Sequence, residues 1–252
     1  MSAESARSLL VVGDRFADFA HAVGATTFSA FVHALDNGDF DSPREELTVH
    51  TGQGIGDYEL GYLREAATRR GLETLIRLTD QPAELVGRQH VHKARADNVL
   101  VAGLEQTGEA DFEAELRLHD HNELLVDVQD RVHVQGMVAI EASRQMFLAV
   151  TEGHVLSRWP QQRYYIVIND MNTKFENFLF PVRARLHLHI DSIDVSDPGK
   201  VPLRVTVTVE QAGRSAATTT VDMIAFAPGV VDGKELRRAK HAAAAVTEPV
   251  GV

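Results

Sequence analysis

The stretch VHVQGMVAIEASRQMFLAV, residues 132–150, decides the fold of this chain. Its apolar residues fall on every side of a 3.6-residue turn and leave no broad polar face, which predicts a buried helix. Glu141, Arg144 and Gln145 nevertheless lie in its middle, at spacings that place them on one side of the helix. Because a buried carboxylate is costly unless it is paired, these residues mark either a structural ion pair or a functional site.

Length and composition exclude several classes of protein. The 252 residues are 44% hydrophobic, which is enough for one large domain or two smaller ones. A net charge of -11 and the absence of any basic run argue against nucleic acid as a partner. The chain has no cysteine, no run of 18 apolar residues and a short polar N-terminus. These features predict a cytoplasmic protein with no membrane span and no membrane partner.

The first 82 residues have the pattern of a small α/β domain. The predicted strands are residues 8–14, 47–50 and 74–78, with a helix at 57–70. The loop GQGIG at 52–56 lies between a strand and a helix, as a dinucleotide-binding loop would, but Asp57 stands where the third glycine is required. Turn formers at 79–82 indicate a domain boundary.

Residues after the boundary have the pattern of an antiparallel sheet. The predicted strands are residues 91–104 and 112–118 before the helix, and 164–168, 185–190, 203–209 and 218–226 after it, with a hairpin turn at 211–214. One long buried helix among such strands predicts an α+β hotdog fold, in which the sheet wraps around a single helix. We therefore expect a small α/β domain at 1–82, a hotdog domain at 90–228 and a tail at 229–252.

Three motifs in the predicted hotdog domain resemble a known family. They are VHKARADNVLV at 91–101, RLHDH at 117–121 and EASRQ at 141–145. In this order they are similar to motifs of the A-factor biosynthesis (AfsA-type) hotdog family, over residues 90–226 as a single repeat. Members of that family usually carry two repeats. The resemblance therefore implies that this chain forms a homodimer, in which two sheets join edge to edge and active sites form between subunits.

The resemblance also implies an activity. The chain would transfer a β-ketoacyl or related acyl group from a carrier-protein or coenzyme A thioester to a small hydroxylated acceptor, in bacterial signalling or secondary metabolism and without a further cofactor. Residues 135–142 also look like the helix of hotdog dehydratases. Dehydration, thioester hydrolysis and a non-catalytic acyl-binding or scaffold role therefore stand as alternatives.

The helix residues receive specific roles under this hypothesis. Glu141 would be a general base, or would orient a hydroxyl, with desolvation raising its affinity for a proton. Arg144 would stabilise an oxyanion or hold a phosphate, and Gln145 would be a further donor. The alternative is that Glu141 and Arg144 form a structural ion pair.

Residues near the helix complete the predicted site. His121 and His133 flank the loop before the helix, where one of them would act as the acid, although loop histidines are often simply solvated. By the resemblance, His92 and Lys93 would contact the substrate or its carrier. Gly136, at the start of the helix, is a further predicted substrate contact.

Two pairs of histidines also have the spacing of metal ligands on one face of a strand. They are His119 with His121 and His187 with His189. Histidines that point outward from a sheet explain the same spacing, and no metal site is predicted.

Overall fold

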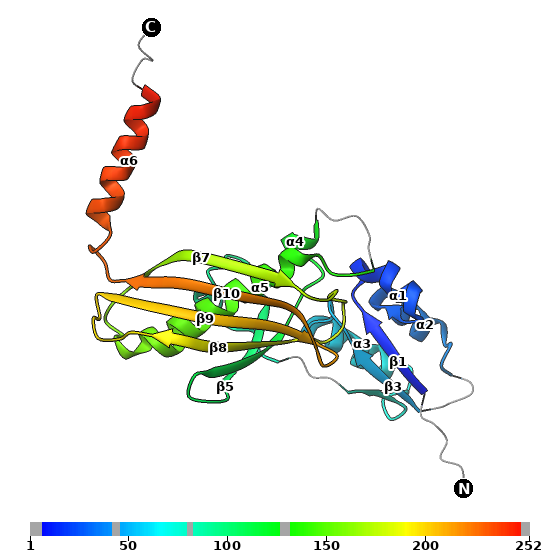
Figure 1. Cartoon of the computed structure of the whole chain (residues 1–252). Coiled ribbons are helices and arrows are strands. Elements are labelled where there is room, and N and C mark those ends of the chain that lie inside the picture. The colour runs from blue at the N-terminus through cyan, green and yellow to red at the C-terminus, as the bar shows by residue number, and fades with distance from the viewer. Residues whose placement is uncertain (1–6, 42–45, 80–82, 127–131, 248–252) are drawn as a thin grey trace.

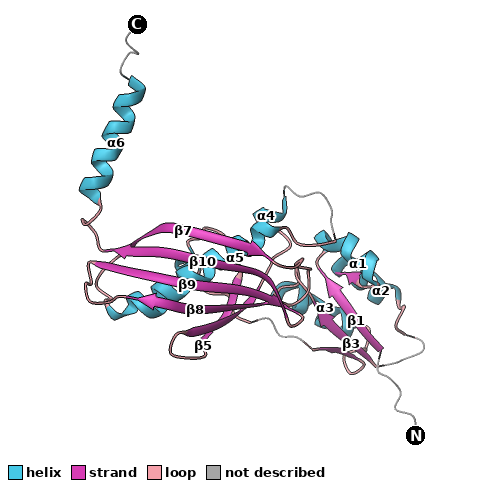
Figure 2. Ribbon diagram, viewed as in Figure 1, coloured by secondary structure: helices cyan, strands magenta, loops and turns pink. Residues whose placement is uncertain are grey.

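Two sheets lie beside each other along the length of the molecule (Figures 1 and 2). The computed structural model describes residues 7–41, 46–79, 83–126 and 132–247. The N-terminal part forms a four-stranded sheet and the remainder forms a six-stranded sheet. The predicted domain boundary at 79–82 falls mostly on residues outside those described.

The N-terminal unit is a parallel sheet with helices between its strands. Its strands are β1 (Arg7–Val12), β2 (Thr26–Thr27), β3 (Leu47–Thr51) and β4 (Ile76–Leu78), in the order β2-β1-β3-β4. Its helices are α1 (Ala17–Val23), α2 (Phe28–Asn37) and α3 (Asp57–Arg69), with a 3-10 turn at Asp14–Phe16. Successive side chains of a strand point to opposite faces, so Val11 packs into a core within this unit and Val12 packs into the core of the second sheet.

The second sheet is antiparallel. Its strands are β5 (Val101–Gln106), β6 (Asp111–Leu116), β7 (Tyr165–Phe175), β8 (Arg185–Ile193), β9 (Lys200–Gln211) and β10 (Arg214–Phe226), in the order β5-β6-β8-β9-β10-β7. A short helix α4 (Glu123–Val126) lies before the long helix α5 (Gly136–Val150). Helix α5 continues through a π-helical turn (Thr151–Val155) and a 3-10 turn (Leu156–Arg158) until Trp159-Pro160 ends it.

Helix α5 lies in the concave side of this sheet, as the hotdog prediction requires (Figure 2). Met146 and Phe147 are fully buried, and their neighbours in the core come from β6, β8, β9 and β10. Burying one such side chain contributes about 1.5–3 kcal/mol. The predicted hotdog fold with a preceding parallel α/β unit is therefore confirmed.

The strand predicted for residues 91–104 is wrong in its first part. Residues Arg88–Val91 and Ala96–Asn98 form 3-10 turns, and β5 begins only at Val101. The side-chain amide of Gln145 on α5 accepts a hydrogen bond from Leu100 N and donates one to Asn98 O, each at 2.8 Å. These backbone groups are satisfied by a helix side chain, so they need no strand partner.

The turn predicted at residues 211–214 is confirmed, because β9 ends at Gln211 and β10 begins at Arg214. Ala212 and Gly213 both have positive φ, 52° and 71°, which fits the twist of a two-residue hairpin. After β10 the tail forms helix α6 (Asp232–Thr247), which projects away from both sheets (Figure 1). Among the described residues no helix has the length and apolar character needed to cross a membrane.

Gln53 joins the two units. Its side chain is 5% exposed. The amide nitrogen donates to the carbonyl oxygens of Leu116 and Val182, each at 3.1 Å, and the amide oxygen accepts from Leu118 N at 2.7 Å. One side chain at the carboxyl end of β3 thus bonds three backbone groups of the hotdog unit.

A second contact fills the crevice at the carboxyl ends of β1 and β3. There Gly13 and Gly54 approach so closely that a Cβ on either would overlap the other glycine, and Asp120 of the hotdog unit lies against both. Asp120 accepts a hydrogen bond from Arg15 N at 3.2 Å. Burial raises the pKa of Asp120. In open α/β sheets a crevice in this position is where ligands bind, but here the chain itself occupies it.

We expect Gln53→Ala to lower the free energy of unfolding by about 2–3 kcal/mol, because it removes the partner of the buried Leu118 N–H and one donor each from Leu116 O and Val182 O, the second of which still accepts from Gln211 Nε2. Urea unfolding followed by circular dichroism measures this change. Gln161→Ala, at an exposed position, is the matched control and should change stability by less than about 0.5 kcal/mol. Equal effects of the two substitutions would show that the Gln53 bonds do not hold the units together.

Candidate functional site

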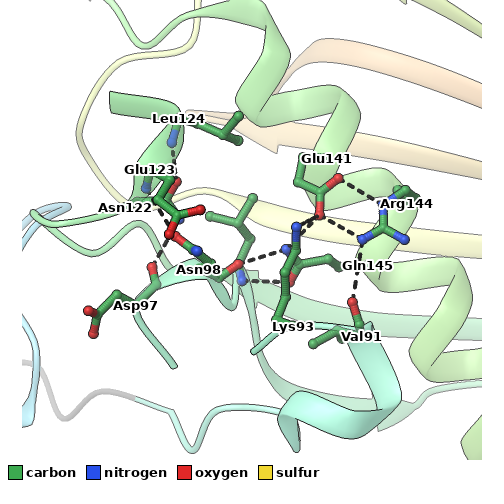
Figure 3. A network of polar contacts seen from close by, with 11 residues as sticks. Val91, Lys93, Asp97, Asn98, Asn122, Glu123, Leu124, Glu141, Arg144 and Gln145 are labelled. Atoms are coloured by element: carbon green, nitrogen blue, oxygen red, sulfur yellow. Dashed lines mark hydrogen bonds and ion pairs between the residues drawn. The ribbon is translucent and has the colours of Figure 1, made fainter. Parts of the chain in front are cut away.

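Glu141 lies at the centre of a polar network on one side of α5 (Figure 3). Arg144 donates to both of its carboxylate oxygens, from Nε at 2.8 Å and from Nη2 at 2.9 Å. Lys93 Nζ lies 2.6 Å from Glu141 Oε1, and Gln145 Nε2 donates to the same oxygen at 3.0 Å. Four of the predicted site residues, Glu141, Arg144, Gln145 and Lys93, are therefore brought together.

The same network connects α5 to the irregular segment that precedes β5. Arg144 Nη2 donates to Val91 O at 3.4 Å, and the fully buried Gln145 bonds Asn98 and Leu100 as described above. Each polar atom of the Gln145 amide is thus used within the chain. Its geometry makes Gln145 a link between helix and segment, and its predicted contact with substrate has no exposed atom to support it.

The expectation that desolvation leaves Glu141 with a raised pKa is wrong. Burial is the largest single influence and does favour the protonated form, but hydrogen bonds from Arg144, Lys93 and Gln145 together outweigh it and lower the pKa to about 2. A carboxylate with this pKa is a weak base near neutral pH. Glu141 is therefore held as an anion within an ion-pair network.

A cavity of about 530 Å³ opens at the N-terminal end of α5. It lies between the start of the helix and the ends of β7 and β10 that meet there. The lining side chains are mostly apolar, with three polar ones among them. They are His133, Val134, Gly136, Ala139, Phe175, Glu176, Asn177, Phe178, Leu179, Ala216 and Ala217.

The cavity and the Glu141 network lie on opposite sides of α5. Gly136 and Ala139 face the cavity. Glu141 follows Ala139 by two residues, which is a rotation of about 200° around the helix. The predicted site residues therefore divide into two groups, with His133 and Gly136 at the cavity and the Glu141 network away from it.

Glu176 is a cavity residue that sequence reasoning missed. Its carboxylate accepts hydrogen bonds from Ser215 Oγ, from Lys174 Nζ at 2.9 Å and from Thr218 Oγ1 at 3.2 Å. These bonds, that from Ser215 first, lower the pKa of Glu176 to about 2. The signal available in the sequence was the aromatic-rich run FENFLF at 175–180, which follows a strand and precedes a proline.

The two remaining predicted residues lie outside both groups. His121 is exposed in the turn before α4, with its ring centroid 5.5 Å from that of His119. His92 has a left-handed backbone, with φ of 54°, and its Nε2 lies 2.5 Å from Glu152 Oε1. The sequence predicts His121 and His133 on either side of the loop before the helix; of the two, His133 lines the cavity and His121 lies beside His119.

His187 and His189, which have the spacing of metal ligands on one strand, contact carboxylates in the structure. His187 lies between Glu113 and Glu210, at 3.4 Å from each, and His189 Nδ1 lies 2.7 Å from Asp111. Over the described ranges, no group of three or more His, Asp or Glu side chains is arranged to hold a metal ion.

Comparison with known proteins identifies one family. The profile of the A-factor biosynthesis hotdog domain matches residues 76–227. This range covers α5, all six strands of the antiparallel sheet and the segment that carries Lys93. No curated protein matches the sequence.

Several solved structures are similar to parts of the chain. A proposed thioesterase from Shewanella oneidensis is 10% identical with a TM-score of 0.42, over 55% of this chain and 94% of that one. A thioesterase variant from Pseudomonas aeruginosa is 10% identical with a TM-score of 0.41, over 59% and 99%. A thioesterase from Haemophilus influenzae is 12% identical with a TM-score of 0.35, over 56% and 82%. Similarity at this level gives no information about the activity of the present chain.

We expect Glu141→Gln to lower the free energy of unfolding most near neutral pH, with a smaller loss in acid. The folded-state pKa of Glu141 is about 2, against an ordinary value of 4.5, so the ionised carboxylate stabilises the fold above about pH 4.5. That stabilisation disappears as the pH falls from about 4.5 towards about 2. Urea unfolding at a series of pH values measures the difference between variant and wild type.

Glu65→Gln, an exposed position on α3, serves as the control and should show no such pH-dependent difference. If the loss caused by Glu141→Gln were the same at every pH, the ionised carboxylate would not be the stabilising species.

Proposed function

Because the chain belongs to the A-factor biosynthesis hotdog domain family, we propose that it transfers an acyl group, of the β-ketoacyl kind, from a thioester to a small hydroxylated acceptor. The thioester is carried by coenzyme A or by an acyl-carrier protein. The observation that carries the proposal is the cavity at the N-terminal end of α5, which combines an apolar lining with a histidine and an unblocked helix start.

The apolar part of the cavity suits an acyl chain. Ala139, Leu179, Ala216 and Ala217 present no charge to it, and Phe175 and Phe178 flank it with aromatic rings. A volume of about 530 Å³ is within the range of small-molecule sites. The acyl chain lies on this surface, with its thioester carbonyl towards Gly136.

The start of α5 supplies donors for the carbonyl oxygen. The first backbone N–H groups of a helix lack acceptors one turn earlier in the helix; Val138 N–H donates to Gln135 O at 3.1 Å, and Gln135 provides no side-chain cap for the N–H groups of Gly136 and Met137. These N–H groups and the helix dipole stabilise the oxyanion that develops as the carbonyl is attacked.

His133 is the proton carrier in this proposal. It lines the cavity, with its ring centroid 4.9 Å from that of Phe178. It takes the proton of the acceptor hydroxyl as the hydroxyl oxygen bonds to the carbonyl carbon, and returns that proton to the thiolate when the carbon–sulfur bond breaks. The products are an ester and a free thiol, and no nucleophile of the chain is needed.

Glu141 acts indirectly. As an anion paired with Arg144 and Lys93, on the side of α5 away from the cavity, it fixes the helix against the segment before β5. It is a positioning residue, because a displacement of the helix would move both His133 and the backbone donors.

The free edge of the sheet supports the homodimer that the family resemblance implies. Strand β7 is last in the strand order, and β10 is its strand partner in the described chain. It is 11 residues long and exposes Tyr165, Ile168 and Phe175. A long edge of this kind is a template for pairing with another strand, so two copies join by antiparallel pairing of β7 with β7.

We expect purified protein to consume a β-ketoacyl thioester in the presence of a small polyol, and His133→Ala to lower kcat about 100-fold. Free thiol release measures the rate, and product mass identifies the reaction: an ester supports transfer, whereas a free acid or an enoyl thioester would replace it by hydrolysis or dehydration. The control is His21→Ala, at an exposed position on α1, which should keep the wild-type rate. Equal rates in both variants would remove His133 from the mechanism.

A further inference from the structure

The lining of the cavity changes from exposed to buried side chains. Phe175 is 55% exposed and Phe178 is 69% exposed, so these two residues lie at the mouth. Ala139, Ala216 and Ala217 also line the cavity, but none of them is more than 3% exposed. Lining residues that water hardly reaches lie at the inner end of the space. The cavity therefore has aromatic rings at its mouth and small apolar side chains at its base.

One wall of the cavity follows the paired strands β7 and β10. Phe175 pairs with Ala217, and Thr173 pairs with Thr219. Because alternate residues of a strand point to the same face, the two threonines come directly behind Phe175 and Ala217 on the core side of the sheet. Thr219 is fully buried, and its hydroxyl oxygen lies 2.9 Å from that of Thr173. Along this wall the apolar surface thus ends at a pair of hydrogen-bonded hydroxyls.

The wall formed by α5 has the same order of side chains. Gly136 and Ala139 line the cavity, and Ser143 follows Ala139 by four residues on the same side of the helix. Ser143 is fully buried, and its hydroxyl donates to the carbonyl oxygen of Ala139 at 2.8 Å. Both walls therefore pass from small apolar residues at the cavity to buried hydroxyls behind it.

These hydroxyls limit how far an apolar chain can enter. A methylene chain that passed the alanines would separate buried hydroxyls from their partners, and a buried polar group without a partner costs free energy. The backbone at the base is also held in place, because Ala216 O accepts hydrogen bonds from Glu176 N at 2.8 Å and from Asn177 N at 3.1 Å. The base is therefore a fixed end of the cavity.

We propose that this base limits the length of the acyl chain, and that Ala139 and Ala217 are the residues that set the limit. The inference rests on the proposed function, in which the acyl chain lies in this cavity with its thioester carbonyl towards Gly136. A chain that just reaches the alanines buries all of its methylene groups. A longer chain either moves its carbonyl away from the start of α5 or leaves part of its tail in solvent. The ligand class is thus an unbranched acyl chain of limited length.

Coenzyme A thioethers with straight alkyl chains test this limit without any reaction, because a thioether has no carbonyl to be attacked. The series runs from butyl to hexadecyl, and isothermal titration calorimetry measures each Kd. For the wild type we expect the affinity to rise by up to about fourfold per methylene until the chain reaches the alanines, and then to stop rising. A continuous rise to hexadecyl, or no dependence on chain length, would overturn the proposal.

Ala139→Val and Ala217→Val each add two methyl groups at the base, from different elements of the fold. We expect both variants to bind the shortest chains as the wild type does and to stop gaining affinity about one or two carbons earlier. For the longest chain that the wild type buries fully, the Kd should rise at least about tenfold. Ala239→Val, at an exposed position on α6, is the control and should leave the limit unchanged. An unchanged limit in both base variants would also overturn the proposal.

The binding series and the transfer assay can fail separately. A limit that the base variants shorten, in a protein that transfers no acyl group, would reject the reaction and retain the role of the two alanines in ligand length. Transfer by the wild type, with a limit that neither variant changes, would retain the reaction and reject that role. Circular dichroism checks the folding of each variant, and the wild-type series decides by itself if a variant does not fold.

Discussion

The contact between Glu141 and its three donors is the interaction on which the rest of the hotdog unit depends. An otherwise apolar helix contains one carboxylate, and that carboxylate is acceptable inside the fold because Arg144, Lys93 and Gln145 all donate to it. The donors come from the helix and from the irregular segment before β5. The ion pair therefore sets where that segment crosses the helix and, through it, where the first strand of the sheet begins.

The Glu141 network and the cavity lie on opposite sides of α5, and the two sides of the helix have different roles. One side binds the chain to itself through charged groups, and the other presents Gly136, Ala139 and the free start of the helix to a space large enough for a ligand. The residues with the most unusual sequence pattern are thus the ones that build the helix into the fold. The proposed chemistry is assigned to residues whose sequence pattern is ordinary, above all to His133.

Much of the fold could be predicted from the sequence, because the spacing of apolar residues along the chain differs between buried helices and strands. The buried helix, the alternating strands after it and the tight turn at 211–214 follow from the spacing of apolar residues and from turn chemistry. Residues 91–100 could not be predicted in this way, since Gln145 replaces the strand partner that their pattern suggested. For the site, the proximity of Glu141, Arg144, Gln145 and Lys93 was predictable, but the proton affinity of Glu141 depends on three donors acting at once. The aromatic run at 175–180 has no regular period, so its place at the cavity became visible only in three dimensions.

The hydrogen bonds by which Gln53 connects the two units have a consequence for how the chain unfolds. Side chains of the N-terminal unit, Val12, Phe16 and Phe19 among them, belong to the same apolar core as α5, and the crevice of the parallel sheet is filled by Asp120. Although the N-terminal unit also has a core of its own, unfolding either unit would expose part of the shared core, so the two sheets should melt in a single cooperative transition. The family match begins at residue 76, whereas the shared apolar core extends back to Val12 of β1.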